Sequence, residues 1–513
     1  MLVKLFGAAV QGIDATIVTI EVNCSRGIKF YLVGLPDSAV KESHERIVSA
    51  LQVNGYKFPT RQIVVNMAPA DIRKEGASYD LPLAIGILAA SETVSAARLA
   101  DYLIIGELSL DGSLQPIKGA LPIAIAARQQ GFKGLILPKQ NAYEAAVVNR
   151  LAVYGAERIT EVIDFLNGTG TLQPTLVNTR EEFYKHQCTF PFDFSEVRGQ
   201  ENVKRALEVA AAGGHNVLLI GAPGSGKSMM AKRLPSILPP LSLGESLETT
   251  KIHSVAGKLG KNTSLIAIRP FRSPHHTISQ VAMVGGGASP QPGEISLAHN
   301  GVLFLDELPE FSRNVLEVLR QPLEDHRITI SRAKYTLEYP ANFQLIASMN
   351  PCPCGRYGQP ELKCTCTKAQ IDRYMHRISG PLLDRIDLQV ELPTVPVKDL
   401  KNRAIAESSA SIKKRVDAAR ARQRERYAEF GIPCNAKLTP GLIRDICQKQ
   451  MTADADNLLT GVFEKGFLSM RSYDKLIRIA QTVADLEGSD SIEKKHISEA
   501  VYFRSLDKKY FNK

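Results

Sequence analysis

The stretch Gly221-Ala-Pro-Gly-Ser-Gly-Lys-Ser228 decides how the middle of this chain must fold. It matches the pattern GxxxxGK[ST], in which glycines let a loop curl until its backbone N–H groups face a phosphate. The apolar segment 216–220 predicts a strand before the loop, and 229–234 predicts the start of a helix after it. The N-terminus of that helix adds a partial positive charge. The sequence therefore predicts a nucleotide-phosphate site in an α/β domain.

The residues of this loop divide the work of holding ATP and Mg²⁺. Lys227 is expected to reach the β- and γ-phosphates, and the Ser228 hydroxyl to coordinate Mg²⁺. The predicted nucleotide-binding set is Gly221, Ala222, Pro223, Gly224, Ser225, Gly226, Lys227, Ser228 and Asp306.

A second motif, Gly301-Val-Leu-Phe-Leu-Asp-Glu307, supplies the acids that ATP hydrolysis needs. Four apolar residues predict a buried strand that delivers Asp306 and Glu307 to its carboxyl end, where ligands bind in open α/β sheets. Asp306 is expected to hold Mg²⁺ through water, and Glu307 to orient and deprotonate the attacking water. The pair favours hydrolysis over simple binding.

Three further polar residues are candidate catalytic groups. Asn350 follows the apolar segment 343–348, and a polar side chain there can contact the γ-phosphate or the water, although alone it could be a turn residue. Arg385 lies in the mostly apolar Leu382–Asp387 stretch, where a cation needs a specific partner. Arg471 precedes a helix-like segment. Structural ion pairing is the alternative for both arginines.

Composition restricts the class of protein. The 513 residues predict about three domains, and 44% hydrophobic with 23% charged residues excludes wholesale disorder. The 63 Lys and Arg against 53 Asp and Glu give a net charge of +10, which is compatible with a polyanionic partner. Residues 401–430 hold nine basic and four acidic residues, which a solvated helix face would also explain. No membrane span or secretory signal is predicted, so a cytoplasmic protein is expected.

The phosphate loop, the strand before the two acids, the strand before Asn350, and then Arg385 and Arg471 follow one another along the chain as they do in AAA+ ATPases, which the sequence therefore resembles. Several segments narrow this resemblance to the magnesium-chelatase-like proteins of the ComM/YifB family. These segments are Val33–Ser43, Asn66–Asp71, Arg272–His276 and Met349–Gly355. The resemblance implies that Arg385 is an arginine finger acting on the neighbouring subunit's ATP and that Arg471 is a sensor of the γ-phosphate. It therefore also implies a ring, most plainly a homo-hexamer.

The same resemblance implies a DNA motor that drives branch migration during recombination of transforming DNA. In this branch of AAA+ proteins, hairpin inserts line the pore, and the segments 268–287 and 326–339 are the candidates here. Arg332 and Lys334, at the tip of the second, are the candidate contacts to single-stranded or branched DNA. Exposed surface charge is the alternative for this tip. The alternative function is ATP-driven remodelling of a protein partner, as in magnesium-chelatase ATPase subunits.

The first 165 residues alternate strand-like and helix-like stretches and predict a mixed α/β domain. This part resembles a Lon-type protease fold, with Ser78 where that fold keeps its nucleophile. Leu121 falls at the place of the activating lysine, and Lys118 comes three residues early. Because a serine without a base is a poor nucleophile, a binding or assembly platform is expected rather than a peptidase.

Four of the eight cysteines, Cys352, Cys354, Cys364 and Cys366, fall within fifteen residues. Four thiolates can complete a tetrahedral Zn²⁺ site, although zinc ribbons usually use C-x₂-C spacing. Free or redox-active thiols are the alternative.

The expected architecture is α/β with three parts. Residues 1–168 form the Lon-protease-like N-terminal domain, 169–190 a linker, 191–398 the AAA+ core, a parallel sheet with helices on both faces, and 399–513 a helical C-terminal lid.

Overall fold

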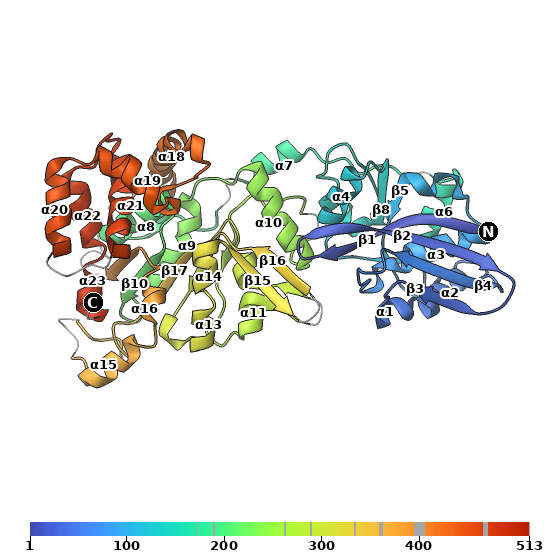
Figure 1. Cartoon of the computed structure of the whole chain (residues 1–513), viewed down its shortest axis with the longest axis horizontal. Helices are drawn as coiled ribbons and strands as arrows, with labels where there is room; N and C mark the ends of the chain where they lie inside the picture. Colours follow the sequence, from blue (N-terminus) through green and yellow to red (C-terminus); the bar gives the residue numbers. More distant parts are fainter. Residues whose placement is uncertain are drawn as a thin grey trace.

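In the computed structural model the chain is elongated, with three units following one another along the long axis (Figure 1). The structure describes residues 1–170, 172–187, 190–260, 263–287, 290–332, 335–358, 363–393, 406–464 and 470–511. The N-terminal unit lies at one end, a second α/β unit in the middle, and a group of helices at the other end. This α/β arrangement with a helical C-terminal region agrees with the predicted fold class.

The N-terminal unit is built on a seven-stranded mixed sheet of order β3-β4-β2-β1-β5-β8-β9. β1 and β2 pair antiparallel and form a long hairpin, and β5, β8 and β9 continue the sheet in parallel. The strands are β1 (Leu2–Gln11), β2 (Asp14–Ser25), β3 (Phe30–Val33), β4 (Gln62–Ala68), β5 (Tyr102–Ile104), β8 (Gly134–Pro138) and β9 (Ala152–Ala156).

Helices cover this sheet. Every residue of α3 (Asp80–Ala90) is buried, which explains why its sequence is apolar on all sides. α4 (Ala120–Gln129) packs against β2 and faces the middle unit. Before β4, α1 (Ser38–Lys41) and α2 (Ser43–Val53) follow one another and are separated by Glu42.

The segment expected to be a linker, 169–190, contains the helix α7 (Thr179–His186). Phe183 of this helix is only 4% exposed and packs with Leu241 and Leu265 of the middle unit. Thr179 Oγ1 donates to the carbonyl of Val147 at 3.1 Å. The connection therefore docks against both units.

The middle unit holds a five-stranded parallel sheet of order β11-β14-β17-β10-β18. Its strands are β10 (Val217–Gly221), β11 (Phe271–Arg272), β14 (Val302–Leu305), β17 (Gln344–Met349) and β18 (Leu388–Leu392). Because all five run the same way, β10, β14 and β17 end on one edge. That edge receives the phosphate loop, the two acids and Asn350.

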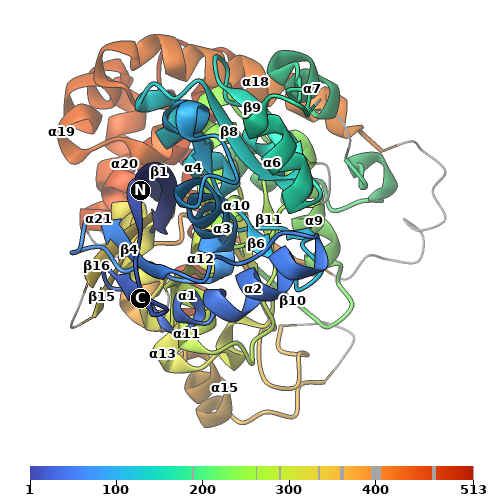
Figure 2. The ribbon, with the colours of Figure 1, turned by 90° about the vertical axis from the view of Figure 1, so that its right-hand side faces the viewer.

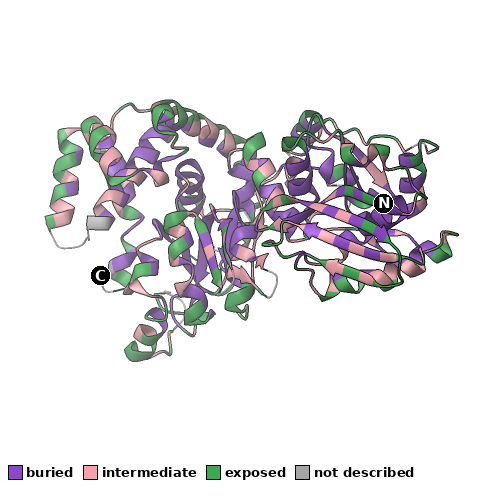
Figure 3. Ribbon diagram, turned by 45° about the vertical axis from the view of Figure 1, so that its right-hand side comes forward, coloured by how far each residue is buried: buried purple, intermediate pink, exposed green. Residues whose placement is uncertain are grey.

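The C-terminal helices are α18 (Ser409–Arg426), α20 (Ala453–Glu464), α21 (Met470–Glu487), α22 (Lys494–Tyr502) and α23 (Leu506–Phe511). α18 and α21 pack on α8 (Glu201–Gly213), and one hydrophobic cluster runs from the sheet into these helices. Buried residues line this contact, while the outer helix faces are exposed (Figure 3). The C-terminal helices are therefore joined to the middle unit by a shared core. Among the described residues, no helix combines the length and apolar character needed to cross a bilayer.

Among the described residues, the contacts between the N-terminal and middle units include the following two. β15 (Arg327–Arg332) and β16 (Tyr335–Pro340) form an antiparallel hairpin that lies beside the β1–β2 turn (Figure 1), where a Cβ on Gly12 would be 3.8 Å from Leu337. α10 (Leu243–Val255) packs against α4, and Gly119 N–H donates to the Ser254 carbonyl at 3.2 Å. A view along the long axis shows the N-terminal strands in front and α15 (Lys368–Met375) projecting at the edge (Figure 2).

Candidate active site

The phosphate loop turns sharply between β10 and α9 (Lys227–Ile237). Gly224 and Gly226 take φ angles of +78° and +92°, a region that favours glycine. A Cβ on Gly221 would lie 2.7 Å from Ser225 Oγ, so the turn has no room for a larger residue. The sequence folds this way because glycine stands where the curl requires it.

Lys227 lies at the centre of the loop. Its ammonium group donates to the carbonyls of Gly221 and Ala222 at 2.7 and 2.8 Å and to Asn350 Oδ1 at 3.1 Å. Burial lowers the pKa of Lys227, although Asp306 and Glu307 act to raise it. The structure thus brings the predicted loop lysine and the predicted Asn350 into direct contact.

Asp306 joins three elements at the end of β14. Its Oδ2 accepts a 2.7 Å hydrogen bond from Ser228 Oγ, and its Oδ1 accepts one from Ser348 Oγ. Ser348, near the end of β17, was not among the predicted residues, although its place one residue before the strand end is a usable signal.

Glu307 stands beside Asp306 in a left-handed conformation with φ of +55°. Its N–H faces Asp306 Oδ1 at 3.2 Å, and its side chain is 55% exposed at the mouth of the site. His276 Nδ1 lies 3.6 Å from Glu307 Oε2. This geometry leaves the carboxylate free to reach a water molecule, and His276 is a neighbour that sequence reasoning did not place there.

These groups line a cavity of about 400 Å³. Its lining residues are Pro223, Gly224, Gly226, Lys227, Ser228, Met229, Asp306, Glu307 and Asn350. The buried Ser225 hydroxyl has no hydrogen-bond partner in the structure, as fits a loop shaped to bind a phosphate. The Ser228 and Asp306 oxygens form the hard donor set that Mg²⁺ prefers. The residues present therefore fit MgATP, whose γ-phosphate is the group that water attacks.

Gln200 is a further residue that sequence reasoning missed. Its side-chain amide donates to the Ser225 carbonyl at 2.8 Å, and its backbone is left-handed with φ of +58°. It therefore supports the phosphate loop from the start of α8.

Arg385 does not line the cavity of its own chain. Its side chain is 11% exposed, with Nη2 2.5 Å from Glu324 Oε1 and Nε donating to the Arg320 carbonyl at 3.0 Å. The backbone of Arg471 lies in the first turn of α21, but its side chain lies outside the described part of the structure, as does that of Arg332 in β15. Lys334 lies outside the described residues altogether.

The two arginines of the insert 268–287 form hydrogen bonds and ion pairs within the same chain. Arg269 donates to the carbonyls of Pro239 and Asn300 at 2.7 Å, and Arg272 forms a bidentate pair with Glu294 at 2.6 and 2.7 Å. His275 and His276 stack with ring centroids 4.1 Å apart. The two arginines therefore hold the insert in place.

The basic stretch near α18 behaves similarly. Arg415 pairs with Glu208 and Glu407, and Arg426 with Asp485 at 2.6 Å. Arg420 donates to the Ala211 carbonyl at 3.1 Å. These three arginines attach the C-terminal helices to α8 or brace them internally, so fewer of the basic residues are free than the count of nine suggests.

The four clustered cysteines converge. All four sulfur atoms lie within 4.8 Å of one another, and Cys352 is fully buried. Tyr357 N–H donates to Cys352 Sγ at 3.3 Å. The seven cysteines that the structure describes are all free thiols.

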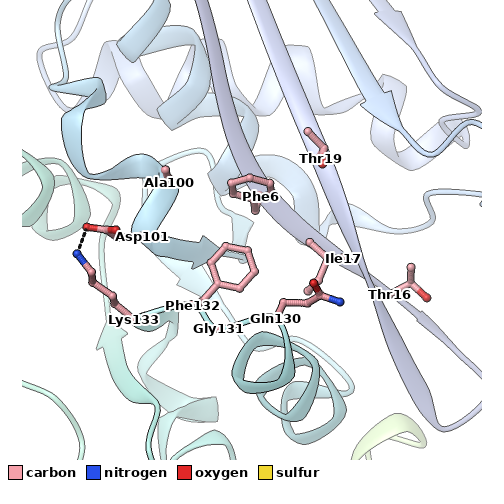
Figure 4. A pocket seen from close by; sticks show the side chains of 10 residues that line it. All are labelled: Phe6, Thr16, Ile17, Thr19, Ala100, Asp101, Gln130, Gly131, Phe132 and Lys133. Atoms are coloured by element: carbon pink, nitrogen blue, oxygen red, sulfur yellow. Dashed lines mark hydrogen bonds and ion pairs between the residues drawn. The ribbon is translucent and has the colours of Figure 1, made fainter.

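The N-terminal unit has a cavity of about 560 Å³ beside the β1–β2 hairpin (Figure 4). Phe6 and Phe132 meet edge to face at 5.1 Å, and the charged lining residues Asp101 and Lys133 pair with each other at 2.9 Å. Ser78 lies in a short 3₁₀ turn, while the Lys118 side chain extends to Gly257 of the middle unit. Lys118 thus serves the contact between units.

Comparisons with known proteins fit this site. The family model "Magnesium chelatase, subunit ChlI" matches residues 193–400, "Subunit ChlI of Mg-chelatase" matches 20–141, and "Magnesium chelatase, subunit ChlI C-terminal" matches 406–504. The chain is 45% identical to the "Uncharacterized protein YifB" of Salmonella typhimurium over 98% of this chain and 96% of that protein.

It is 43% identical to the "Competence protein ComM" of Haemophilus influenzae over 98% of this chain and 97% of that protein. A more distant likeness, 22% identity over 74% of this chain and 42% of the relative, is to the "Zygotic DNA replication licensing factor mcm6" of Xenopus tropicalis. The predicted resemblance is confirmed: the chain belongs to the magnesium-chelatase-like ComM/YifB family of AAA+ ATPases.

Proposed function

We propose that this AAA+ ATPase assembles into a homo-hexameric ring and couples ATP hydrolysis to DNA remodelling, as a branch-migration helicase in recombination of transforming DNA. Residues 191–398 are the motor, 399–513 its lid, and 1–168 a platform for binding or assembly. The main support for ATP hydrolysis is that Lys227, Asp306 and Asn350 line one cavity.

Each site residue has a proposed role in hydrolysis. Lys227 binds the phosphates, Ser228 and Asp306 hold Mg²⁺, and Glu307 removes a proton from the attacking water. Asn350 and Arg471 sense the γ-phosphate. Asn350 is assigned from its place after β17, and Arg471 from the family resemblance.

The position of Arg385 supports the ring. It lies outside its own chain's cavity, and a cation given to a neighbouring subunit has a target only in an oligomer. In the ring, Arg385 would leave Glu324 and bind a phosphate of the neighbouring subunit's ATP, which would complete that subunit's site. Arginine fingers contribute about 10³–10⁵ in rate in other nucleotide hydrolases.

Two observations support DNA as the load. The relatives include a competence protein and a replication licensing factor, and the net charge is +10. β15 ends at Arg332, and Lys334 lies two residues further along the sequence. We propose that these two residues contact DNA phosphates, so that binding weakens steeply as salt rises.

The four-cysteine cluster is proposed to bind structural Zn²⁺. Four converging free thiols match the donor number and type of a closed tetrahedral site. Reduced thiols also suit the reducing cytoplasm, where the protein is proposed to act.

The deciding experiment compares the wild type with Glu307→Gln on a branched DNA substrate. The wild type is expected to hydrolyse ATP faster with DNA and to displace a strand, while Glu307→Gln binds ATP and DNA without displacement. Glu429→Gln, at an exposed position of the lid, is the matched charge control.

Arg332→Ala with Lys334→Ala tests the hairpin. DNA-stimulated hydrolysis should fall while DNA-free hydrolysis stays, and Arg327→Ala at the hairpin base is the control. Turnover indifferent to single-stranded and branched DNA at low salt contradicts the DNA assignment. Stimulation by a protein partner instead would establish the alternative function.

A further inference from the structure

The cysteine cluster has the dimensions of a metal site. The sulfur atoms of Cys352 and Cys354 are 3.3 Å apart, those of Cys354 and Cys364 are 3.6 Å apart, and those of Cys352 and Cys364 are 3.7 Å apart. Tetrahedral Zn²⁺ with Zn–S bonds of about 2.3 Å places its sulfur ligands about 3.8 Å apart. Cys366 completes a set of four. A single ion can therefore bind all four with little rearrangement.

The entry to this cluster is tied to the ATP site. Cys352 follows two residues after Asn350, whose Oδ1 accepts from Lys227 at 3.1 Å. Between them lies only Pro351, so a fixed Cys352 restricts where Asn350 can lie.

The turn of the cluster rests directly on the phosphate loop. Gly355 has φ of +75°, and a Cβ there would lie 2.4 Å from Cδ of Pro223. Its N–H donates to the Cys352 carbonyl at 2.9 Å, which closes the turn. The loop held by the cysteines therefore supports Pro223, a residue that lines the nucleotide cavity.

The exit from the cluster is tied to the other side of the same site. Thr367, immediately after Cys366, caps α15 through a capping box with Gln370. Beyond α15, Arg377 donates to Pro309 O at 3.2 Å and to Glu310 Oε2 at 2.9 Å. Those acceptors belong to the turn that begins directly after Glu307.

A last contact reaches the C-terminal helix. Tyr357 meets Tyr510 of α23 edge to face at 6.2 Å, and Tyr510 donates to Glu391 Oε1 of β18 at 2.7 Å. The cysteine loop thus contacts the phosphate loop through Gly355 and α23 through Tyr357, and it follows Asn350 closely in the chain. Its link to the turn after Glu307 runs through α15 and Arg377.

We infer that a Zn²⁺ ion bound by Cys352, Cys354, Cys364 and Cys366 braces the ATP site, so that nucleotide affinity depends on the metal. The inference rests on the zinc site proposed above and deepens it, but needs neither DNA nor a ring. Without the ion the four thiols have no common centre, and Gly355 loses the restraint that holds it on Pro223. Loss of the metal by chelation then weakens ATP binding.

The test measures three quantities on the purified full-length chain: zinc per chain by mass spectrometry, Kd for a fluorescent ATP analogue with Mg²⁺, and the thermal unfolding midpoint. Cys364→Ser with Cys366→Ser should lose zinc and weaken nucleotide binding roughly tenfold. The single variant Cys366→His keeps four zinc ligands and should retain both zinc and nucleotide affinity. Cys24→Ala, in the N-terminal unit, is the control for loss of a buried thiol.

Gly355→Ala separates the brace from the metal. It leaves the four thiols in place but forces a methyl group against Pro223, so zinc should remain while nucleotide binding weakens. Gly358→Ala is the matched control, because its φ is +77° and its Cβ would meet nothing closer than 3.6 Å.

The outcomes separate cleanly. A wild type without near-stoichiometric zinc overturns the site itself. Zinc-free Cys364→Ser with Cys366→Ser that binds nucleotide as the wild type does overturns the brace and leaves the metal site standing. A zinc-free variant that unfolds well below the wild type shifts the decision to Gly355→Ala, whose unchanged Kd overturns the brace. Failure of DNA stimulation bears on the proposed load and on none of these measurements.

Discussion

Ser228 Oγ donates a 2.7 Å hydrogen bond to Asp306 Oδ2, joining the first turn of α9 to the end of β14. The two oxygens come from elements far apart in sequence, and the parallel strands β10, β17 and β14 bring them to the same edge of the sheet. They are the oxygens expected to share one Mg²⁺ ion.

Ser228→Ala is predicted to weaken MgATP binding by about 1–3 kcal/mol, since Asp306 Oδ2 loses its hydrogen-bond donor and Mg²⁺ loses a ligand. Isothermal titration with MgATP measures the change. Ser228→Thr keeps the hydroxyl and should bind like the wild type; equal loss in both variants would contradict a role for the hydroxyl.

Arg385→Ala is predicted to lower hydrolysis by about 10³ while nucleotide affinity stays within a few-fold, because the guanidinium acts on the neighbour's ATP. Steady-state ATPase assays at several protein concentrations test this. Arg313→Ala, an exposed arginine of the same unit, is the control. Full-speed hydrolysis by a monomeric Arg385→Ala variant would remove the ring from the proposal.

Lys475→Met is predicted to lower the free energy of unfolding by about 3–5 kcal/mol, because it leaves the buried Asp387 carboxylate without its cation. Lys475 Nζ lies 3.4 Å from Asp387 Oδ1 and donates to the Ile386 carbonyl at 3.0 Å, which joins α21 to the segment just before β18. Urea denaturation followed by circular dichroism measures the loss. Lys494→Met, exposed on α22, should cost little; a small change in Lys475→Met as well would show that the pair contributes no net stability.

Stability is predicted to fall as the pH drops from about 6.5 towards 4, in part through His326. Burial and the neighbouring Lys437 lower the pKa of His326 to about 4. The unfolded chain therefore binds a proton in this range that the folded chain refuses, and folding is favoured less as pH falls.

His326→Asn tests this prediction. Asparagine tolerates the left-handed backbone at this position, where φ is +55°, and its amide oxygen can accept from Lys437. The difference in urea midpoint between pH 7.5 and 5 should shrink relative to the wild type. An unchanged difference would assign the acid sensitivity to other groups.

The phosphate loop and the strands that carry the acids could be predicted because their signals are local. Gly224 and Gly226 stand where the turn needs positive φ, and apolar runs mark β10, β14 and β17. Parallel order then places their ends on one edge. The roles of Asn350, Arg385 and Arg471 remain predictions that enzymology must test.

Other parts of the site were beyond sequence reasoning because they depend on tertiary contacts. Gln200 reaches the phosphate loop only because α8 starts beside it, and His276 meets Glu307 across two strands. The Gly355–Pro223 contact joins segments more than a hundred residues apart. The arginines of α18 looked free because their acidic partners are distant in sequence. The docking of the segment 169–190 could not be predicted for the same reason, since Phe183 finds its apolar partners in another unit.

The seam between the first two units has a practical consequence for anyone dissecting the protein. Ile13, at the β1–β2 turn, packs into the hydrophobic cluster of the middle unit, and Ser254 of α10 hydrogen-bonds to Glu144. Removal of the N-terminal unit would remove these partners and expose apolar side chains of the middle unit next to the hairpin β15–β16. Activity lost in such a shortened protein would report a damaged surface, and point substitutions at the seam are the sounder way to ask what the first unit contributes.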